Sequence, residues 1–145
     1  TKIQIAQFPA WEKDIRAYYD NWTTMLKGDI PENVAVLRKL ENSNYELFGL
    51  TNWSAETFPF ALKNYDFFAI FKDKIVVSGT EKLIKPDPKI WNLLLDRYQI
   101  KAEESVFIDD NFKNIETAKS LGFICIHIQE NTNLEKQLRD LGVKF

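Results

Sequence analysis

Residues 105–111 read Ser-Val-Phe-Ile-Asp-Asp-Asn, and this stretch decides how the rest of the chain is interpreted. Its apolar residues, 106–108, are typical of a strand that helices cover on both faces. The strand ends on two adjacent carboxylates, Asp109 and Asp110. Because neighbouring carboxylates repel each other, the pair requires a compensating cation. The stretch therefore predicts a buried strand whose end is the first place to look for a functional site.

Three further runs predict strands, and helical patterns lie between them. The strand candidates are residues 45–51, 74–78 and 123–128, and the helices begin at Pro31, at Asp87-Pro88, near Ile115 and at Asn133. A proline or a polar side chain at the start, and a glycine such as Gly122 after the end, are usual boundary signals of helices. Strands that alternate with helices predict an α/β fold, here a Rossmann-like three-layer α/β/α sandwich with a mostly parallel sheet.

Polar side chains follow three of these strands. Thr51 and Asn52 end the first, Lys85 lies in the loop after the second, and Asp109 and Asp110 end the third. Right-handed crossovers bring the carboxyl ends of parallel strands to one edge of the sheet, where ligands bind. A hydroxyl, an ammonium and Mg²⁺ held by carboxylates would together bind a phosphoryl group. Each feature alone is also an ordinary turn or surface residue, but their order along three strands favours a shared site.

Composition excludes several classes of protein. The chain of 145 residues is 45% apolar and 28% charged, which is usual for a globular domain. A formal net charge of −2 without a cluster of basic residues argues against a nucleic-acid partner. No apolar run is long enough to span a membrane. The single cysteine, Cys125, has no intrachain disulfide partner and reads as a small core residue. We therefore expect a cytoplasmic protein.

The first 28 residues follow a different pattern, in which apolar residues recur at helical spacing. These residues are Ile15, Tyr18, Tyr19, Trp22, Met25 and Leu26. We expect a helical segment that packs on or beside the α/β unit. Trp11, Trp22 and Trp91 are expected to pack helices.

The motifs at the strand ends resemble motifs two, three and four of the haloacid dehalogenase superfamily. The matching stretches are residues 50–54 (Leu-Thr-Asn-Trp-Ser), 84–88 (Ile-Lys-Pro-Asp-Pro) and 106–111 (Val-Phe-Ile-Asp-Asp-Asn), followed by Asn114 and Ala118. The likeness covers essentially the whole chain and is closest to the cap-bearing branch, which includes sugar-phosphate phosphatases and the N-terminal phosphatase domain of soluble epoxide hydrolase. It implies that residues 1–28 are the C-terminal part of a helical cap and that residues 29–145 are the core.

For the phosphoryl group, the resemblance implies a role for each of several neighbouring residues. Thr51 would hydrogen-bond the transferring phosphoryl oxygen, with the amide region of Asn52 beside it. Lys85 would neutralise the nucleophile and the phosphoryl charge. Trp53 follows directly, and it is a candidate either for lining the substrate pocket or for ordinary packing.

For the metal, the resemblance implies Mg²⁺ coordinated directly by Asp109, with Asp110 on the ion or on one of its waters. Asn114 would support this site from the next helix. Metal-independent dehalogenases of the superfamily generally lack the paired carboxylates. The resemblance therefore favours a phosphatase that acts on small phosphorylated metabolites, particularly sugar phosphates, through an aspartyl-phosphate intermediate.

One motif of the family has no counterpart. The first motif, Asp-x-Asp, supplies the nucleophile and the general acid/base at the end of the first core strand, and no Asp-x-Asp occurs in the sequence. We therefore expect the core to lack its first strand, and an N-terminal segment of the same protein, absent from these residues, to carry it. That strand would lie between the strands that end at Thr51 and Asp109, and this chain alone would be inactive.

There are three alternative functions. A phosphorylation-receiver domain also uses an Asp pair, a Thr and a Lys, but it places the acidic pair at its first strand, whereas here the pair comes last. A non-catalytic binding module of the same superfamily would explain the missing nucleophile, and a haloacid dehalogenase is the third. Among the remaining residues, His127 is expected to be a half-buried edge residue and Ser78-Gly79 a loop-forming pair.

Overall fold

The computed structural model describes residues 1–43 and 45–145, which form two units, Thr1–Ile30 and Pro31–Phe145. The first unit consists of helices: α1 Lys2–Gln7, η1 Pro9–Trp11, α2 Glu12–Asn21 and η2 Trp22–Met25. The hydroxyl of Tyr19 in α2 donates to Oε1 of Gln4 in α1 over 2.9 Å. The helical prediction for this segment is confirmed, and its assignment to a cap stays a prediction.

All four predicted strands are present in the second unit, each shorter than predicted. They are β1 Gly49–Thr51, β2 Ile75–Val77, β3 Val106–Asp109 and β4 Ile124–His127. The pairing is parallel, as expected, with Thr51 opposite Val77 and Asp109 opposite His127. In the part of the chain that the structure describes, β1–β2 and β3–β4 are two separate two-stranded sheets.

Four helices of this unit agree with the sequence analysis. They are α3 Pro31–Asn42, α6 Lys89–Tyr98, α7 Phe112–Ser120 and α8 Leu134–Asp140. Four further helical elements were not expected: α4 Phe58–Asn64, η3 Asp66–Phe71, α5 Ser78–Glu81 and η4 Ala102–Glu104. The prediction that Ser78-Gly79 forms a loop is therefore wrong, because both residues belong to the first turn of α5.

The boundary signals act as predicted. The Asn133 side chain accepts a hydrogen bond from the backbone N–H of Lys136 at the start of α8. Oδ1 of Asp87 accepts from the backbone N–H of Lys89 over 3.0 Å, although the helix itself begins one residue later than expected. After α7 the chain turns through Gly122, whose φ of 94° suits glycine best.

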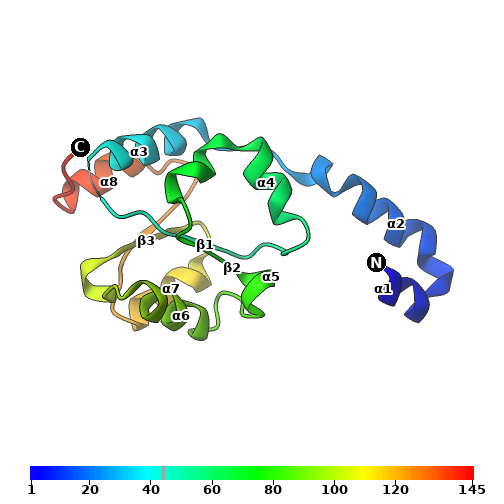
Figure 1. Cartoon of the computed structure of the whole chain (residues 1–145). Helices are drawn as coiled ribbons and strands as arrows, with labels where there is room; N and C mark the ends of the chain where they lie inside the picture. Colours follow the sequence, from blue (N-terminus) through cyan, green and yellow to red (C-terminus); the bar gives the residue numbers. More distant parts are fainter. Residues whose placement is uncertain (44) are drawn as a thin grey trace. The chain divides into compact units, whose positions relative to one another are not determined.

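Two apolar clusters lie on opposite faces of the strands, which makes the unit three-layered. Phe107 belongs to a cluster with residues of α6 and α7, whereas its neighbours Val106 and Ile108 pack against a cluster from α3 and α8. Alternate residues of a strand point to opposite faces, so the two clusters are the two cores of the sandwich. Figure 1 shows α6 and α7 on one side of the strands and α3 and α8 on the other. The three-layer prediction is confirmed.

Both strand pairs contribute to the same core. Val76 of β2 lies in one cluster with Phe107 of β3, and Leu50 of β1 packs against that cluster. Trp91 is fully buried there and packs its helix as predicted, whereas Trp11 in the other unit is 62% exposed. In residues 1–43 and 45–145, no helix is both long and apolar enough to cross a bilayer.

Candidate functional site

A buried ion pair lies where β1 and β3 end. The Nζ atom of Lys85, in the loop between α5 and α6, is 2.6 Å from Oδ2 of Asp109. The two side chains are only 9% and 7% exposed. The same Nζ donates to the backbone oxygen of Leu50 over 2.8 Å. One ammonium group therefore joins the end of β1 to the end of β3.

The second oxygen of Asp109 is also held. Oδ1 accepts from the backbone N–H of Asn111 over 2.8 Å and from Nδ2 of Asn114 over 3.0 Å. Asn114 lies in the first turn of α7 and is 5% exposed. A carboxylate bonded on both oxygens has its orientation fixed by the protein before any ligand arrives, which is the arrangement that electrostatic catalysis requires.

The rings of Phe107 and Trp91 form an aromatic wall on one side of the Lys85 ammonium. Nζ of Lys85 lies 5.6 Å from the centre of the Phe107 ring. The Phe107 ring meets that of Trp91 edge-on, with the centroids 5.5 Å apart. The wall keeps water from this side of the ion pair, so the charges interact more strongly than they would at the surface.

Asn52 fixes the backbone of Lys85. Its Nδ2 donates to the carbonyl oxygen of Lys85, and its Oδ1 accepts from the Lys85 N–H, each over 2.9 Å. The residue after β1 is thus bonded to the loop that carries the ammonium, 33 positions further along the chain.

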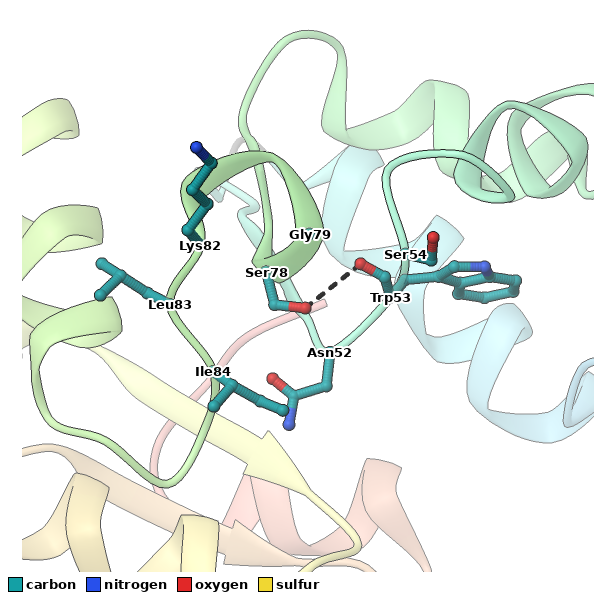
Figure 2. Close-up of a pocket in the computed structure, with 8 residues that line it drawn as sticks. All are labelled: Asn52, Trp53, Ser54, Ser78, Gly79, Lys82, Leu83 and Ile84. Carbon is teal, nitrogen blue, oxygen red and sulfur yellow. Dashed lines mark hydrogen bonds between the residues drawn. The ribbon is translucent and has the colours of Figure 1, made fainter. Parts of the chain in front are cut away.

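A cavity of about 360 Å³ adjoins this loop (Figure 2). Its lining residues are Asn52, Trp53, Ser54, Ser78, Gly79, Lys82, Leu83 and Ile84. The backbone carbonyl of Trp53 accepts from Oγ of Ser78 and from the N–H of Gly79. At Gly79 the two segments approach so closely that a Cβ atom would lie 2.3 Å from the backbone nitrogen of Ala55, so only glycine fits.

The Trp53 side chain faces away from this cavity. Figure 2 shows its ring pointing away from Asn52, Ser78 and Ile84. Nε1 donates to Oγ1 of Thr57 over 3.0 Å, and the ring packs edge-on against Phe58 and Phe68. The contacts described are those of a packing residue, and a role in substrate binding stays a prediction.

Thr51 and Asp110 are at the ends of β1 and β3, as expected. Thr51 is half-buried and Asp110 is exposed. Among residues 1–43 and 45–145, no hydrogen bond joins either side chain to the Lys85–Asp109 pair. The backbone oxygen of Asp110 lies 2.9 Å from Nε2 of His127, which is half-buried at the edge strand as predicted. The roles of Thr51 and Asp110 therefore stay predictions.

Sequence reasoning missed three contributors to this site: the Leu50 carbonyl, the Phe107 ring and the side-chain bonds of Asn52. Leu50 precedes Thr51, and Phe107 belongs to the apolar run 106–108 that ends at Asp109, so the proximity of both to the site could have been inferred. The partner of Asn52 lies in a distant loop, and no local pattern indicates it.

The donor atoms are those that Mg²⁺ prefers. Asp109 and Asp110 supply adjacent carboxylates, and Mg²⁺ sites in proteins commonly use one or two carboxylates completed by waters and phosphate oxygens. In the described residues, no group of three or more His, Cys, Asp or Glu side chains gathers as a complete metal cage. The chemistry of these donors fits Mg²⁺.

Cys125 takes no part in the site. It is partly buried against the core cluster, and burial raises the pKa of its thiol. A thiol that stays protonated is a poor nucleophile, which agrees with the predicted role as a small core residue.

Curated proteins with several different names are similar to this chain. Drimenol cyclase DrtB of Aspergillus calidoustus is 30% identical over 105 residues, or 72% of this chain and 20% of the cyclase. Sesquiterpene phosphatase AstK of Aspergillus oryzae is 26% identical over 128 residues, or 88% and 64% of the two chains. Mouse bifunctional epoxide hydrolase 2 is 32% identical over 74 residues, or 50% and 13%. The chain thus spans less than two thirds of the length of each of these relatives.

Solved structures agree on the fold. A HAD-family enzyme of Bacteroides thetaiotaomicron, crystallised as a magnesium complex, matches with a TM-score of 0.71 at 24% identity, over 81% of this chain and 62% of that one.

The family comparison covers nearly all of the chain. Residues 2–128 match the family described as haloacid dehalogenase-like hydrolase, and these include every residue of the Lys85–Asp109 site. The resemblance drawn from the three strand-end motifs is therefore confirmed, and the chain belongs to the haloacid dehalogenase-like hydrolase family.

Proposed function

We propose that this chain forms the phosphoryl-binding edge of a Mg²⁺-dependent phosphatase that acts on small phosphorylated metabolites. The observation that carries the proposal is the buried Lys85–Asp109 pair at the ends of β1 and β3. A cation that the fold has already fixed needs no reorganisation when negative charge develops beside it. Phosphoryl transfer depends mainly on such positioning and charge stabilisation, which favours a phosphatase over other hydrolases of the family.

Lys85 would bind the phosphoryl group. Its ammonium donates to Leu50 and Asp109, and one N–H remains after these two bonds. That donor, with the hydroxyl of Thr51 at the end of β1, would bind phosphoryl oxygens. Phe107 would exclude water from the inner side of the ammonium.

Asp109 and Asp110 would hold the Mg²⁺ ion. Asn114 and the backbone of Asn111 orient Asp109, so its carboxylate would need little rearrangement. Bound there, the ion would offset the repulsion between the two carboxylates and the charge of the phosphoryl oxygens.

The nucleophile of this proposal is an aspartate outside these residues. Asp109 is a poor candidate for the nucleophile because this proposal assigns its carboxylate to the Mg²⁺ ion. We propose that a segment of the same protein adds a strand with an Asp-x-Asp motif between β1 and β3. Two observations support this: within the described chain each of these strands pairs on one side only, and their ends are bridged by Lys85. Its first carboxylate would attack phosphorus as the alcohol leaves with a proton from the second, and water would then hydrolyse the aspartyl phosphate.

A second candidate is a non-catalytic module of the same family, which binds phosphorylated ligands without turnover. The absence of Asp-x-Asp from the sequence favours it. Activity of the full-length protein separates the two candidates, since only the first requires turnover.

The test is hydrolysis of p-nitrophenyl phosphate by the full-length protein, with Mg²⁺ or with a chelator. We expect turnover only with Mg²⁺, and a loss on the order of 100-fold or more in Asp109→Asn. Asp140→Asn is the matched control, because Asp140 lies on the surface, paired with Lys136. Undiminished turnover in chelator would contradict the metal-dependent mechanism. The substrate panel should contain sugar phosphates, and also a sesquiterpenyl monophosphate in view of the similarity to a sesquiterpene phosphatase.

A further inference from the structure

Both hydrogen bonds that the structure gives to the Asn52 side chain go to one residue, Lys85. Its Oδ1 accepts from the N–H of Lys85 and its Nδ2 donates to the carbonyl of Lys85, both over 2.9 Å. A side-chain amide carries a donor and an acceptor side by side, as a peptide group does, so it can pair with both polar groups of one backbone residue. This is the pairing that a neighbouring strand would make, supplied by a side chain.

Few other bonds fix the backbone of this loop. Lys85 is followed by Pro86, which has no N–H, and the bond from the Asp87 N–H to the Ile84 carbonyl closes the turn without involving Lys85. In the described part of the chain, both backbone hydrogen bonds of Lys85 therefore go to Asn52.

The position of the Lys85 backbone determines where its ammonium reaches. The ammonium contacts the Leu50 carbonyl, Oδ2 of Asp109 and the face of Phe107, all within distances that a displacement of about one ångström would break. Asn52 follows β1 directly, so it ties the loop to the same strand whose Leu50 carbonyl accepts from Lys85.

We infer that Asn52 is a positioning residue: its side chain holds Lys85 so that the ammonium stays on Asp109 and on the phosphoryl group. The inference rests on the proposed function, and it adds a second role to Asn52, whose predicted contact with the phosphoryl group stays a prediction. Asn52 is exposed, so water can replace its bonds, and its removal displaces the loop without unfolding the protein.

The first test is a kinetic double-mutant cycle in the full-length protein with p-nitrophenyl phosphate. Asn52→Ala should lower kcat on the order of 10- to 100-fold, and Lys85→Ala should lower it further. In the Lys85→Ala background, Asn52→Ala should have no further effect, because its effect passes through the ammonium. Asn64→Ala is the control, because that side chain also bonds a backbone carbonyl, that of Phe60, outside the site. An equal loss from Asn52→Ala with and without Lys85 would overturn the inference.

The second test does not depend on activity. Hydrogen exchange of the Lys85 amide, followed by NMR, should become faster in Asn52→Ala and stay unchanged in Asn64→Ala, since Asn52 is the acceptor of that N–H. Unchanged exchange would overturn the inference whatever the activity. If exchange is faster in Asn52→Ala but the wild-type protein shows no turnover, the proposed function is overturned. The hydrogen bond between Asn52 and Lys85 would still be established.

Discussion

Nζ of Lys85 and Oδ2 of Asp109 lie 2.6 Å apart, with both side chains less than one tenth exposed. Removing one partner of such a pair leaves the other charge buried without compensation. Lys85→Met should therefore lower the free energy of unfolding by about 3–5 kcal/mol, measured by urea denaturation. Lys136→Met, which breaks an exposed pair with Asp140, should cost no more than about 0.5 kcal/mol.

The double variant Lys85→Met/Asp109→Leu provides the decisive comparison. Since both charges are then absent, it should be less destabilised than Lys85→Met alone. If the double variant loses as much free energy of unfolding as Lys85→Met and Asp109→Leu lose together, the two residues are not energetically coupled.

Mg²⁺ should stabilise the folded protein through the carboxylates at the end of β3. A ligand that binds only the folded state raises the melting temperature, and the increase grows with the logarithm of the ligand concentration above Kd. The wild type should melt at a clearly higher temperature in Mg²⁺ than in chelator. This difference in melting temperature should be mostly lost in Asp110→Asn and retained in Asp140→Asn. A shift of equal size in all three proteins would assign the effect to general screening by salt.

The ion pair between α5 and α6 predicts a pH-dependent stability. Two hydrogen bonds from Arg97 hold the pKa of Glu81 below its ordinary value of 4.5, although partial burial acts in the opposite direction. A lowered pKa means that the charged carboxylate stabilises the fold above pH 4.5, and that this contribution is lost as the pH falls through the folded-state pKa.

Glu81→Gln should therefore cost about 0.2–1 kcal/mol at pH 7, the range for partly exposed pairs, and progressively less below pH 4.5. Urea denaturation across this pH range measures the difference. Glu41→Gln, on the exposed end of α3, is the control for the substitution itself and should change the stability at pH 7 by less than about 0.5 kcal/mol. A Glu81→Gln penalty that stays constant between pH 7 and pH 3 would contradict the assigned role of the ion pair.

The close approach at Gly79 predicts an unequal effect of two glycine substitutions. Gly79→Ala puts a Cβ atom 2.3 Å from the backbone nitrogen of Ala55 and should cost about 3 kcal/mol or more, since backbone must move. Gly122→Ala meets no atom closer than 3.8 Å and should cost only about 1 kcal/mol, from its positive φ. Equal losses in thermal unfolding would contradict the assigned packing.

Strands and their order could be predicted because buried parallel strands are apolar runs with polar ends. Residues 105–109 alone gave both β3 and the position of Asp109. The strand predicted over residues 45–51 is paired only over Gly49–Thr51, because its partner β2 is itself three residues long. The resemblance to the haloacid dehalogenase-like family could be recognised from the motifs for a related reason. The fold fixes where each strand ends, and the chemistry fixes which polar residue stands there.

Helical elements that tertiary contacts hold were missed. α4 and η3 lie in an aromatic-rich stretch without a clear apolar period, where Phe58 and Ala61 pack against Val77 of β2. α5 has only four residues, and its start is bonded to the Trp53 carbonyl. The cap assignment of residues 1–28 and the cytoplasmic location stay predictions. The same holds for the site roles of all seven candidate residues: Thr51, Asn52, Trp53, Lys85, Asp109, Asp110 and Asn114.

The aromatic wall behind Lys85 gives the site an optical signal. Trp91 is fully buried, and its indole N–H has no hydrogen-bond partner among the described residues, so we expect its fluorescence emission at short wavelength. The ring of Phe107 contacts both the Trp91 indole and the Lys85 ammonium, so it links the fluorophore to the charged group. If the other three tryptophans are replaced by phenylalanine, all tryptophan emission comes from Trp91. A change in the intensity or wavelength of this emission would then report the binding of an anion to the Lys85 ammonium, without any added label.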